Sequence, residues 1–332
     1  MKVAILGMGS VGKGVLKMIG EKDLDIKVTA VADSKSALMD RDGISIGEVL
    51  EAKRVHGFCG DKSLNAMEVV TGADYDALVE VTPTNANTGE PALTHIIAAM
   101  DRGHHVVTSN KGPIAREFSM LRSIAREKRV QIRYEATVGG AIPIMHTLDQ
   151  GLAGNRILAI FGILNGTCNF ILNRMADEGL TYEQALLEAR EMGYAEADPT
   201  YDVKGIDPAI KLVILANTFW KKTVKLEDVE ITGIDKLTND ALRLAEEQDC
   251  TIRLIAEAIP DRGILRVAPR LLPISHPLVV EGTFNAITIE TDMAGEITLI
   301  GKGAGSIETA SAIIGDLLYI RDRHEGSHSK TA

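Results

Sequence analysis

The N-terminal stretch limits the possible folds most strongly, because it places a glycine-rich turn between two regular elements. The apolar run KVAIL at 2–6 ends in GMGSVG at 7–12, and an amphipathic segment then continues to Gly20. This order predicts a strand, a tight turn and a helix. Glycines let the backbone approach a pyrophosphate closely, and a helix start offers free amides to the anion. We therefore predict a dinucleotide-binding turn, with tight-turn glycines alone as the alternative, formed by Gly7, Gly9, Ser10, Val11 and Gly12.

The next apolar stretch ends in an acid at the distance expected for a ribose-binding residue. Residues 26–32 predict a second strand, and Asp33 follows about 20 residues after the last glycine of the turn. Asp33 would accept hydrogen bonds from the ribose hydroxyls, which favours NAD. Ser34, Lys35 and Arg41 lie nearby and could instead receive the 2′-phosphate of NADP. The coenzyme choice stays open, and we expect contacts from Asp33 and Ser34.

Beyond 44–73, to which the sequence assigns no chemistry, strands and helices alternate. Strands are expected at 77–81, 104–108 and 130–134, and helices at 89–102 and 113–128. This alternation predicts an α/β fold with a Rossmann-type doubly wound parallel sheet. Ligands bind such sheets at the carboxyl ends of the strands. Coenzyme contacts are therefore expected from Thr82, Pro83, Thr108, Asn110 and Lys111. For the lysine, an exposed loop position is the alternative.

The composition changes after Tyr134, where the chain becomes small and glycine-rich. The segment 135–143 fits a crossing between two domains, or a close approach of the backbone to a ligand. Its carbonyls and Glu135 could hold a cation, with a plain domain junction as the alternative. The strand expected at 156–164 then leads to a second helix start near Cys168, which suits a small carboxylate. This helix start is formed by Asn165, Gly166 and Thr167.

The stretch 196–216 sets several acids beside one lysine in an apolar setting. Asp207 before Pro208 predicts a helix start, with the Asp207 carboxylate capping free amides. Lys211 follows four residues later, and this spacing places both side chains on one helix face. The apolar residues after Lys211 should partly desolvate its amine, which suits a group that exchanges a proton near neutral pH. The alternative is a modest surface ion pair of about 0.2 to 0.5 kcal/mol.

The last third of the chain predicts a second domain of a different kind. Strands are expected at 252–258, 264–268, 285–291 and 296–300. They lack crossover helices, which predicts an α+β domain with a mixed or antiparallel sheet. A glycine-rich loop should then return the chain to the coenzyme through Gly301 and Gly305. We expect a dinucleotide domain at 1–135 completed by a helix within 301–320, a substrate-binding and dimerisation domain at 136–300, and a disordered tail at 321–332.

The totals exclude several classes of function. The net charge is −10 and aromatic residues make up 4% of the chain, which opposes binding to nucleic acid or to an acidic membrane. The three cysteines are far apart and indicate neither a disulfide frame nor a zinc site. No apolar run reaches the roughly 20 residues of a membrane span, and a strand directly after Met1 leaves no room for a signal peptide. We therefore expect a cytoplasmic protein.

Six motifs, in this order, resemble homoserine dehydrogenase along nearly the whole chain. They are GMGSVG at 7–12, TSNKGP at 108–113, YEATVGGAIPI at 134–144, NGTCNFIL at 165–172, GYAEADPTYDVKGIDPAIKL at 193–212, and GKGAG with TASAIIGDL within 301–317. The resemblance is to the short form, without a C-terminal ACT domain or fused aspartate kinase. It implies reversible reduction of L-aspartate 4-semialdehyde to L-homoserine with NAD(P)H, for threonine, methionine and isoleucine biosynthesis, by a homodimer.

The resemblance also implies roles for single residues. Lys211 matches the family's acid/base lysine, Asp207 the acid beside it, and Lys111 a second lysine near the nicotinamide. Acids that hold the amino and hydroxyl groups of the substrate match Glu196 and Asp202. Other substrate contacts match Tyr194, Gly166 and Thr167, while Asn165 begins the helix that suits the carboxylate. A monovalent cation, sodium or potassium, is implied at the main-chain carbonyls of Glu135, Val138, Gly140 and Ile142.

Two other functions remain open at this point. Another NAD(P)-dependent amino-acid or semialdehyde dehydrogenase is possible, and a phosphorylating one would need a thiolate, for which Cys168 is the cysteine next to a candidate site. Its place at the start of an apolar helix is more typical of a small packing residue. A non-catalytic dinucleotide-sensing protein is the second alternative. It is opposed by the acidic charge, by the lack of a basic stripe, and by Lys211 with its acids, which a binding module does not need.

Overall fold

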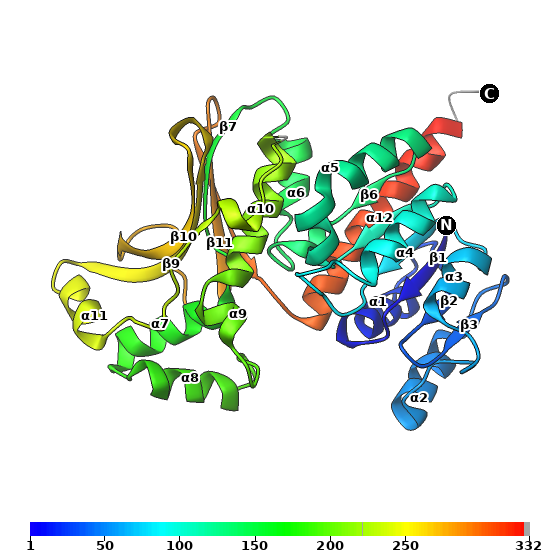
Figure 1. Ribbon diagram of the computed structural model, residues 1–332, viewed down its shortest axis with the longest axis horizontal. Helices are drawn as coiled ribbons and strands as arrows, with labels where there is room; N and C mark the ends of the chain where they lie inside the picture. The colour runs from blue at the N-terminus through cyan, green and yellow to red at the C-terminus, as the bar shows by residue number, and fades with distance from the viewer. Residues whose placement is uncertain (221, 329–332) are drawn as a thin grey trace. The chain divides into compact units, whose positions relative to one another are not determined.

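The chain divides into two compact units. A computed structural model describes residues 1–220 and 222–328 (Figure 1). The first unit comprises Met1–Thr137 and the segment from Gly305 onward, and the second comprises Val138–Ala304. The chain returns from the second unit to the first between Ala304 and Gly305, four residues beyond the expected boundary at 300/301. The last strand of the second unit stays paired as far as Lys302.

The first unit contains a six-stranded sheet in the order β3-β2-β1-β4-β5-β6. Its strands are β1 (Lys2–Leu6), β2 (Lys27–Ala32), β3 (Ala37–Met39), β4 (Ala77–Glu80), β5 (His105–Thr108) and β6 (Ile132–Arg133). All neighbours are parallel except β3, which pairs with β2 in the antiparallel direction. The predicted Rossmann-type sheet is confirmed, with β3 as an edge strand that the sequence did not indicate.

The helices of this unit come from both ends of the sequence. They are α1 (Ser10–Glu21), α2 (Ile46–His56), α3 (Ala66–Gly72), α4 (Ala92–Asp101), α5 (Lys111–Lys128) and α12 (Ser306–His328). Helix α12 packs against α1, and one buried cluster joins Ile5 of β1, Leu16 of α1 and Leu317 of α12. The C-terminal segment therefore completes the core of the unit.

Helix α12 is longer than the sequence suggested. Helix α12 continues over 321–328, where a disordered tail was expected, and 329–332 lie outside the described residues. The polar composition of this stretch favoured a tail, but the side chains of Arg321 and Arg323 have partners in the fold. Arg321 donates to the carbonyl of Leu24 at 2.7 Å, and the Arg323 guanidinium lies 4.3 Å from the ring centre of Tyr319.

The second unit contains a mixed sheet in the order β12-β11-β7-β9-β10-β8, as predicted. Its strands are β7 (Ile157–Ile163), β8 (Glu230–Ile231), β9 (Cys250–Ile259), β10 (Ile264–Pro273), β11 (Phe284–Thr291) and β12 (Glu296–Lys302). Its helices are α6 (Ile144–His146), α7 (Gly166–Glu178), α8 (Tyr182–Glu191), α9 (Thr200–Val203), α10 (Ile206–Trp220) and α11 (Asn239–Glu246). Only β8 and β10 pair in parallel. In the described part of the chain, no helix has the length and apolar composition needed to cross a membrane.

Candidate functional site

The glycine-rich turn joins β1 to α1 in the tight geometry that the sequence predicted. Gly7 has φ +105°, and its N–H donates to the carbonyl of Ala32 at 2.8 Å. A Cβ on Gly7 would lie 2.4 Å from the carbonyl oxygen of Val81, and one on Gly12 would lie 1.9 Å from that of Gly7. The first turn of α1, with Gly9, Ser10 and Val11, is at least partly exposed. Its backbone amides therefore fit the pyrophosphate of a dinucleotide.

Of the second glycine-rich loop, at 301–305, only Gly305 belongs to the unit that contains the glycine turn. Gly305 directly precedes α12, and the Ser306 hydroxyl donates to the carbonyl of Ser10 at 2.6 Å. Gly301, in contrast, lies in β12 of the second unit, opposite Asn285. Of the two predicted coenzyme glycines, the structure thus brings Gly305 to the start of α1 and leaves Gly301 in the second sheet.

The carboxyl ends of β4 and β5 gather five residues predicted to contact the coenzyme, namely Thr82, Pro83, Thr108, Asn110 and Lys111. The amide of Asn110 donates to the carbonyls of Thr82 at 3.1 Å and Pro83 at 3.5 Å. The same side chain caps α5, whose first residue is Lys111. One side chain therefore fixes both loops relative to the start of the helix that carries the lysine.

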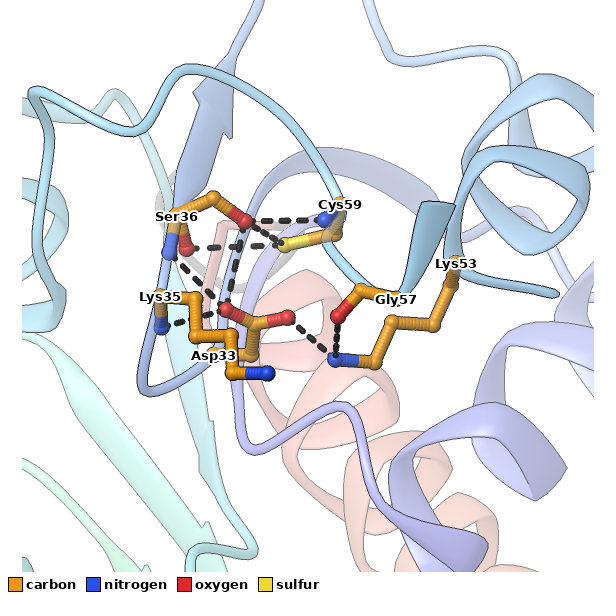
Figure 2. A network of polar contacts seen from close by, with 6 residues as sticks. All are labelled: Asp33, Lys35, Ser36, Lys53, Gly57 and Cys59. Atoms are coloured by element: carbon orange, nitrogen blue, oxygen red, sulfur yellow. Dashed lines mark hydrogen bonds and ion pairs between the residues drawn. The ribbon is translucent and has the colours of Figure 1, made fainter. Parts of the chain in front are cut away.

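Asp33 lies where the ribose-binding acid was expected, but its carboxylate is already occupied. Figure 2 shows Oδ1 accepting from the N–H groups of Lys35 at 2.7 Å and Ser36 at 2.9 Å, and Oδ2 paired with the ammonium of Lys53. Lys53 also donates to the carbonyl of Gly57 at 3.1 Å. Burial acts to raise the pKa of Asp33, but the hydrogen bonds from Lys53 and Lys35 hold it below its usual value.

The ion pair makes Lys53 part of the candidate coenzyme site. Sequence analysis missed it, because 20 residues separate it from Asp33 and no helical spacing relates them. The side chain of Asp33 is 5% exposed and that of Lys53 19%, while Ser34 beside them is exposed. Within this ion pair, the more accessible charge is therefore the Lys53 ammonium and not the Asp33 carboxylate.

In the second unit, Lys211 and Asp207 form the buried pair that their spacing predicted. Lys211 Nζ lies 2.7 Å from Asp207 Oδ2 and donates to the carbonyl of Leu164 at 2.6 Å. The two residues are 8% and 9% exposed. The helix, however, begins at Ile206, so Asp207 lies inside the first turn and is not the N-cap that the sequence suggested. Its carboxylate is directed to the lysine instead.

Asn165 links this pair to a second acid. Its Nδ2 donates to Asp202 Oδ1 at 2.7 Å and to Asp207 Oδ2 at 3.0 Å. Its Oδ1 accepts from the N–H of Cys168 at 2.9 Å and so caps α7. A side-chain amide has two N–H donors, and both are used here. The side chain of Asn165, predicted to lie at the substrate site, thus holds two carboxylates in place.

The other predicted substrate residues lie around the start of α7, with one exception. Gly166 and Thr167 open the helix, and the Thr167 hydroxyl donates to the carbonyl of Tyr194 at 2.7 Å. The Tyr194 ring packs edge-on against Phe170, with 5.0 Å between ring centres. Glu196 is exposed and makes no hydrogen bond or ion pair with the residues that the structure describes.

Cys168 is unsuited to the thiolate role that the rival function needs. The residue is fully buried, and its Sγ donates to the carbonyl of Asp202 at 3.1 Å. Burial, followed by the charges of Asp202 and Asp207, raises the pKa of the thiol well above its usual value. A thiol held neutral is a poor nucleophile, so the structure favours the packing role.

The segment implied for a cation is a tight turn with unusual backbone angles. Gly139 and Gly140 have φ of +82° and +56°, and Val138 and Ile142 beside them are buried. The Ile142 carbonyl accepts from the N–H of Ile144 at 2.8 Å. Glu135, in the first unit, is also buried and donates its N–H to Asp316. Within 1–220 and 222–328, no cluster of three or more His, Cys, Asp or Glu side chains could hold a metal ion.

Comparison with known proteins gives one consistent family. Residues 143–318 match the homoserine dehydrogenase family model, and 7–135 match the NAD-binding domain of homoserine dehydrogenase. The homoserine dehydrogenase of Methanocaldococcus jannaschii is 44% identical over 332 residues, covering 96% of this chain and 98% of the relative. The NAD(+)-dependent homoserine dehydrogenase of Pseudomonas canavaninivorans is 35% identical, with 96% of each chain covered.

Solved structures agree with the sequence comparisons. A hyperthermophilic archaeal homoserine dehydrogenase in complex with NADPH superposes with a TM-score of 0.85 at 29% identity, covering 97% of this chain and 98% of that one. The glycine turn at 7–12 and Lys211 both fall within the matched regions. The chain therefore belongs to the homoserine dehydrogenase family of NAD(P)-dependent oxidoreductases.

Proposed function

We propose that Lys211 is the acid and base in the reversible reduction of L-aspartate 4-semialdehyde to L-homoserine. When bound, NAD(P)H supplies the hydride for the aldehyde carbon. The carbonyl oxygen needs a proton as it becomes an alkoxide. Lys211 suits this step because its ammonium is buried and is held by Asp207 and the Leu164 carbonyl. This cluster is the observation that carries the proposal.

The charged groups of the substrate have candidate partners in the same unit. Asp202 and Glu196 are acids suited to the α-ammonium, and Asp202 lies one bridging amide away from Asp207. The free amides at Gly166 and Thr167 suit the α-carboxylate, because a helix start attracts anions. Tyr194 lies beside this helix start through its bond to Thr167. We assign these five residues to substrate binding.

Two further residues act around the proton transfer. Lys111, at the start of α5, is proposed to polarise the carbonyl. Asn165 is proposed to position Asp202 and Asp207 and not to touch the substrate. Oxidation of L-homoserine with NAD⁺ and with NADP⁺, followed by the absorbance of the reduced nicotinamide, measures the activity. Absence of turnover with both coenzymes would reject the function.

The Asp33–Lys53 pair supports use of NADP(H) as well as NAD(H). Among the relatives, one is NAD(+)-dependent and another was solved with NADPH, so the family likeness leaves both open. A carboxylate whose two oxygens have donors is a weak acceptor for ribose hydroxyls, whereas the Lys53 ammonium can donate to a 2′-phosphate. Ser34, exposed beside them, can add a hydroxyl.

Lys53→Met should lower kcat/KM for NADPH about 20-fold and change kcat/KM for NADH less than about threefold. The variant removes the cation that would face the 2′-phosphate and frees Asp33 for ribose hydroxyls. Lys62→Met is the matched control, because Lys62 lies in the same region but contacts the ring of Phe58 at 4.2 Å. It should leave both values unchanged. An equal loss for both coenzymes in Lys53→Met would remove Lys53 from coenzyme selection.

The turn at 138–142 is proposed to bind sodium or potassium through the carbonyls of Val138, Gly140 and Ile142. Main-chain carbonyls of alternate residues in a tight turn are a suitable donor set for a monovalent cation. Replacing sodium and potassium by choline at constant ionic strength should lower the melting temperature, and sodium or potassium chloride should restore it. Equal melting curves in all three salts would contradict the site.

A homodimer through the second unit is proposed from its exposed apolar side chains. Pairing of β11 with β12 places Phe284 and Ile300 on the same face of the sheet. Phe284 is 43% exposed and Ile300 is 55% exposed, which a second copy would cover. Sedimentation velocity should then give about twice the chain mass of 35.7 kDa.

A further inference from the structure

We propose that Glu80 is a positioning residue for the coenzyme loops at the ends of β4 and β5. Glu80 is the last residue of β4 and is fully buried. A buried carboxyl group is costly unless hydrogen bonds or a cation compensate it. The buried His95 of α4 lies beside it, with its Nδ1 3.6 Å from Glu80 Oε1. The inference rests on coenzyme binding at these loops.

Apart from its pairing in the sheet, Glu80 makes hydrogen bonds to residues of the two loops. Its Oε1 accepts from the Thr82 hydroxyl and, at 3.3 Å, from the Thr82 N–H. Its main-chain carbonyl accepts from the Thr108 hydroxyl at 2.8 Å, and that hydroxyl accepts from the N–H of Asn110 at 2.9 Å. Asn110 in turn bonds to the Thr82 carbonyl and caps the helix that begins at Lys111. Glu80 therefore takes part in one hydrogen-bond network through both its side chain and its main-chain carbonyl.

The second oxygen of the Glu80 carboxyl group is not stabilised by a hydrogen bond from the described residues. Glu80 Oε2 and His95 Nδ1 are buried and have no hydrogen-bond partner among the described residues. A site selected for stability alone would favour an apolar side chain, because a buried polar group without a full set of partners destabilises the fold. The hydrogen bonds from Thr82 to Glu80 instead hold the start of the loop that follows β4.

Glu80→Leu should raise the dissociation constant of NADPH about tenfold, because the Thr82 loop loses its anchor. Glu80→Gln should stay within about twofold of the parent, since its side-chain oxygen still accepts from Thr82. Fluorescence titration of NADPH measures both values, and thermal melting records stability separately. Thr29→Val is the control for a lost buried hydrogen bond elsewhere in the unit, because the Thr29 hydroxyl donates to the carbonyl of Asp74. It should lower the melting temperature only.

The proposal is overturned if folded Glu80→Leu binds NADPH as the parent does, or if Glu80→Gln is as impaired as Glu80→Leu. Should Glu80→Leu not fold, Thr82→Val removes the same hydrogen bond from a half-buried residue, and unchanged affinity there overturns the proposal as well. Asn110→Ala distinguishes failure of the Glu80 proposal from absence of coenzyme binding at these loops. If Asn110→Ala also leaves NADPH affinity unchanged, the coenzyme does not bind at these loops.

Discussion

Lys211→Met should lower kcat about 10³-fold and change the dissociation constant of NADPH less than about twofold. Met fills a similar apolar volume but cannot give or take a proton. Lys211 belongs to the second unit, whereas the glycine turn, Asp33 and Lys53 belong to the first. The loss should therefore fall on turnover and not on coenzyme binding. Steady-state oxidation of homoserine and fluorescence titration of NADPH measure the two quantities.

The chain offers a matched control for this variant. Lys204 pairs with Asp235 at 2.6 Å in the same unit, but its side chain is 50% exposed. Lys204→Met should keep kcat within about twofold, because an exposed pair adds little. Lys211→Met leaves the Asp207 carboxylate buried without its cation, which should cost about 3 kcal/mol of unfolding free energy. Rates are therefore compared well below the melting temperature, and a folded variant within tenfold of the parent kcat would contradict the role.

The fold of this chain could be predicted where one local pattern decides an element. The run 2–6 and the glycines after it require a strand, a turn and a helix, and the structure has all three. The region 44–73 carries no such pattern. Helix α2 buries only Val49, so its sequence has almost no apolar stripe from which a helix could be predicted. Strand β3 is three residues long and owes its place to pairing with β2.

The contacts of the candidate site likewise divide into those that a local sequence pattern predicts and those that it does not. The contact of Asp207 with Lys211 follows from a spacing of four along one helix, and the sequence predicted it. The Leu164 carbonyl is 47 residues away from Lys211, and no local pattern points to it. Glu80 gave a weaker signal that could have been used, because it is a charge in an otherwise apolar strand, ALVE, expected to be buried. Its partners, however, come from separate loops and another helix.

Asp207→Asn should lower kcat about 10²-fold and leave α10 intact. The amide keeps one acceptor oxygen for two donors, Lys211 Nζ and Asn165 Nδ2, and it removes the charge that faces the ammonium. The helix start does not depend on this carboxylate, because the N–H of Ala209 donates to the carbonyl of Gly205. Circular dichroism should therefore show unchanged helix content. A role in capping alone predicts unchanged turnover instead, since Asn also caps.

Two further variants decide how Asp207 acts. Asp235→Asn removes the acid of the exposed pair and should keep kcat within about twofold. The double variant Lys211→Met/Asp207→Asn should be less than about threefold slower than Lys211→Met alone, because residues that act as a unit lose their effect together. If the two losses multiply, Asp207 acts on the substrate directly and not through Lys211. If they do not, the buried pair is one catalytic unit that the spacing of four along α10 assembles.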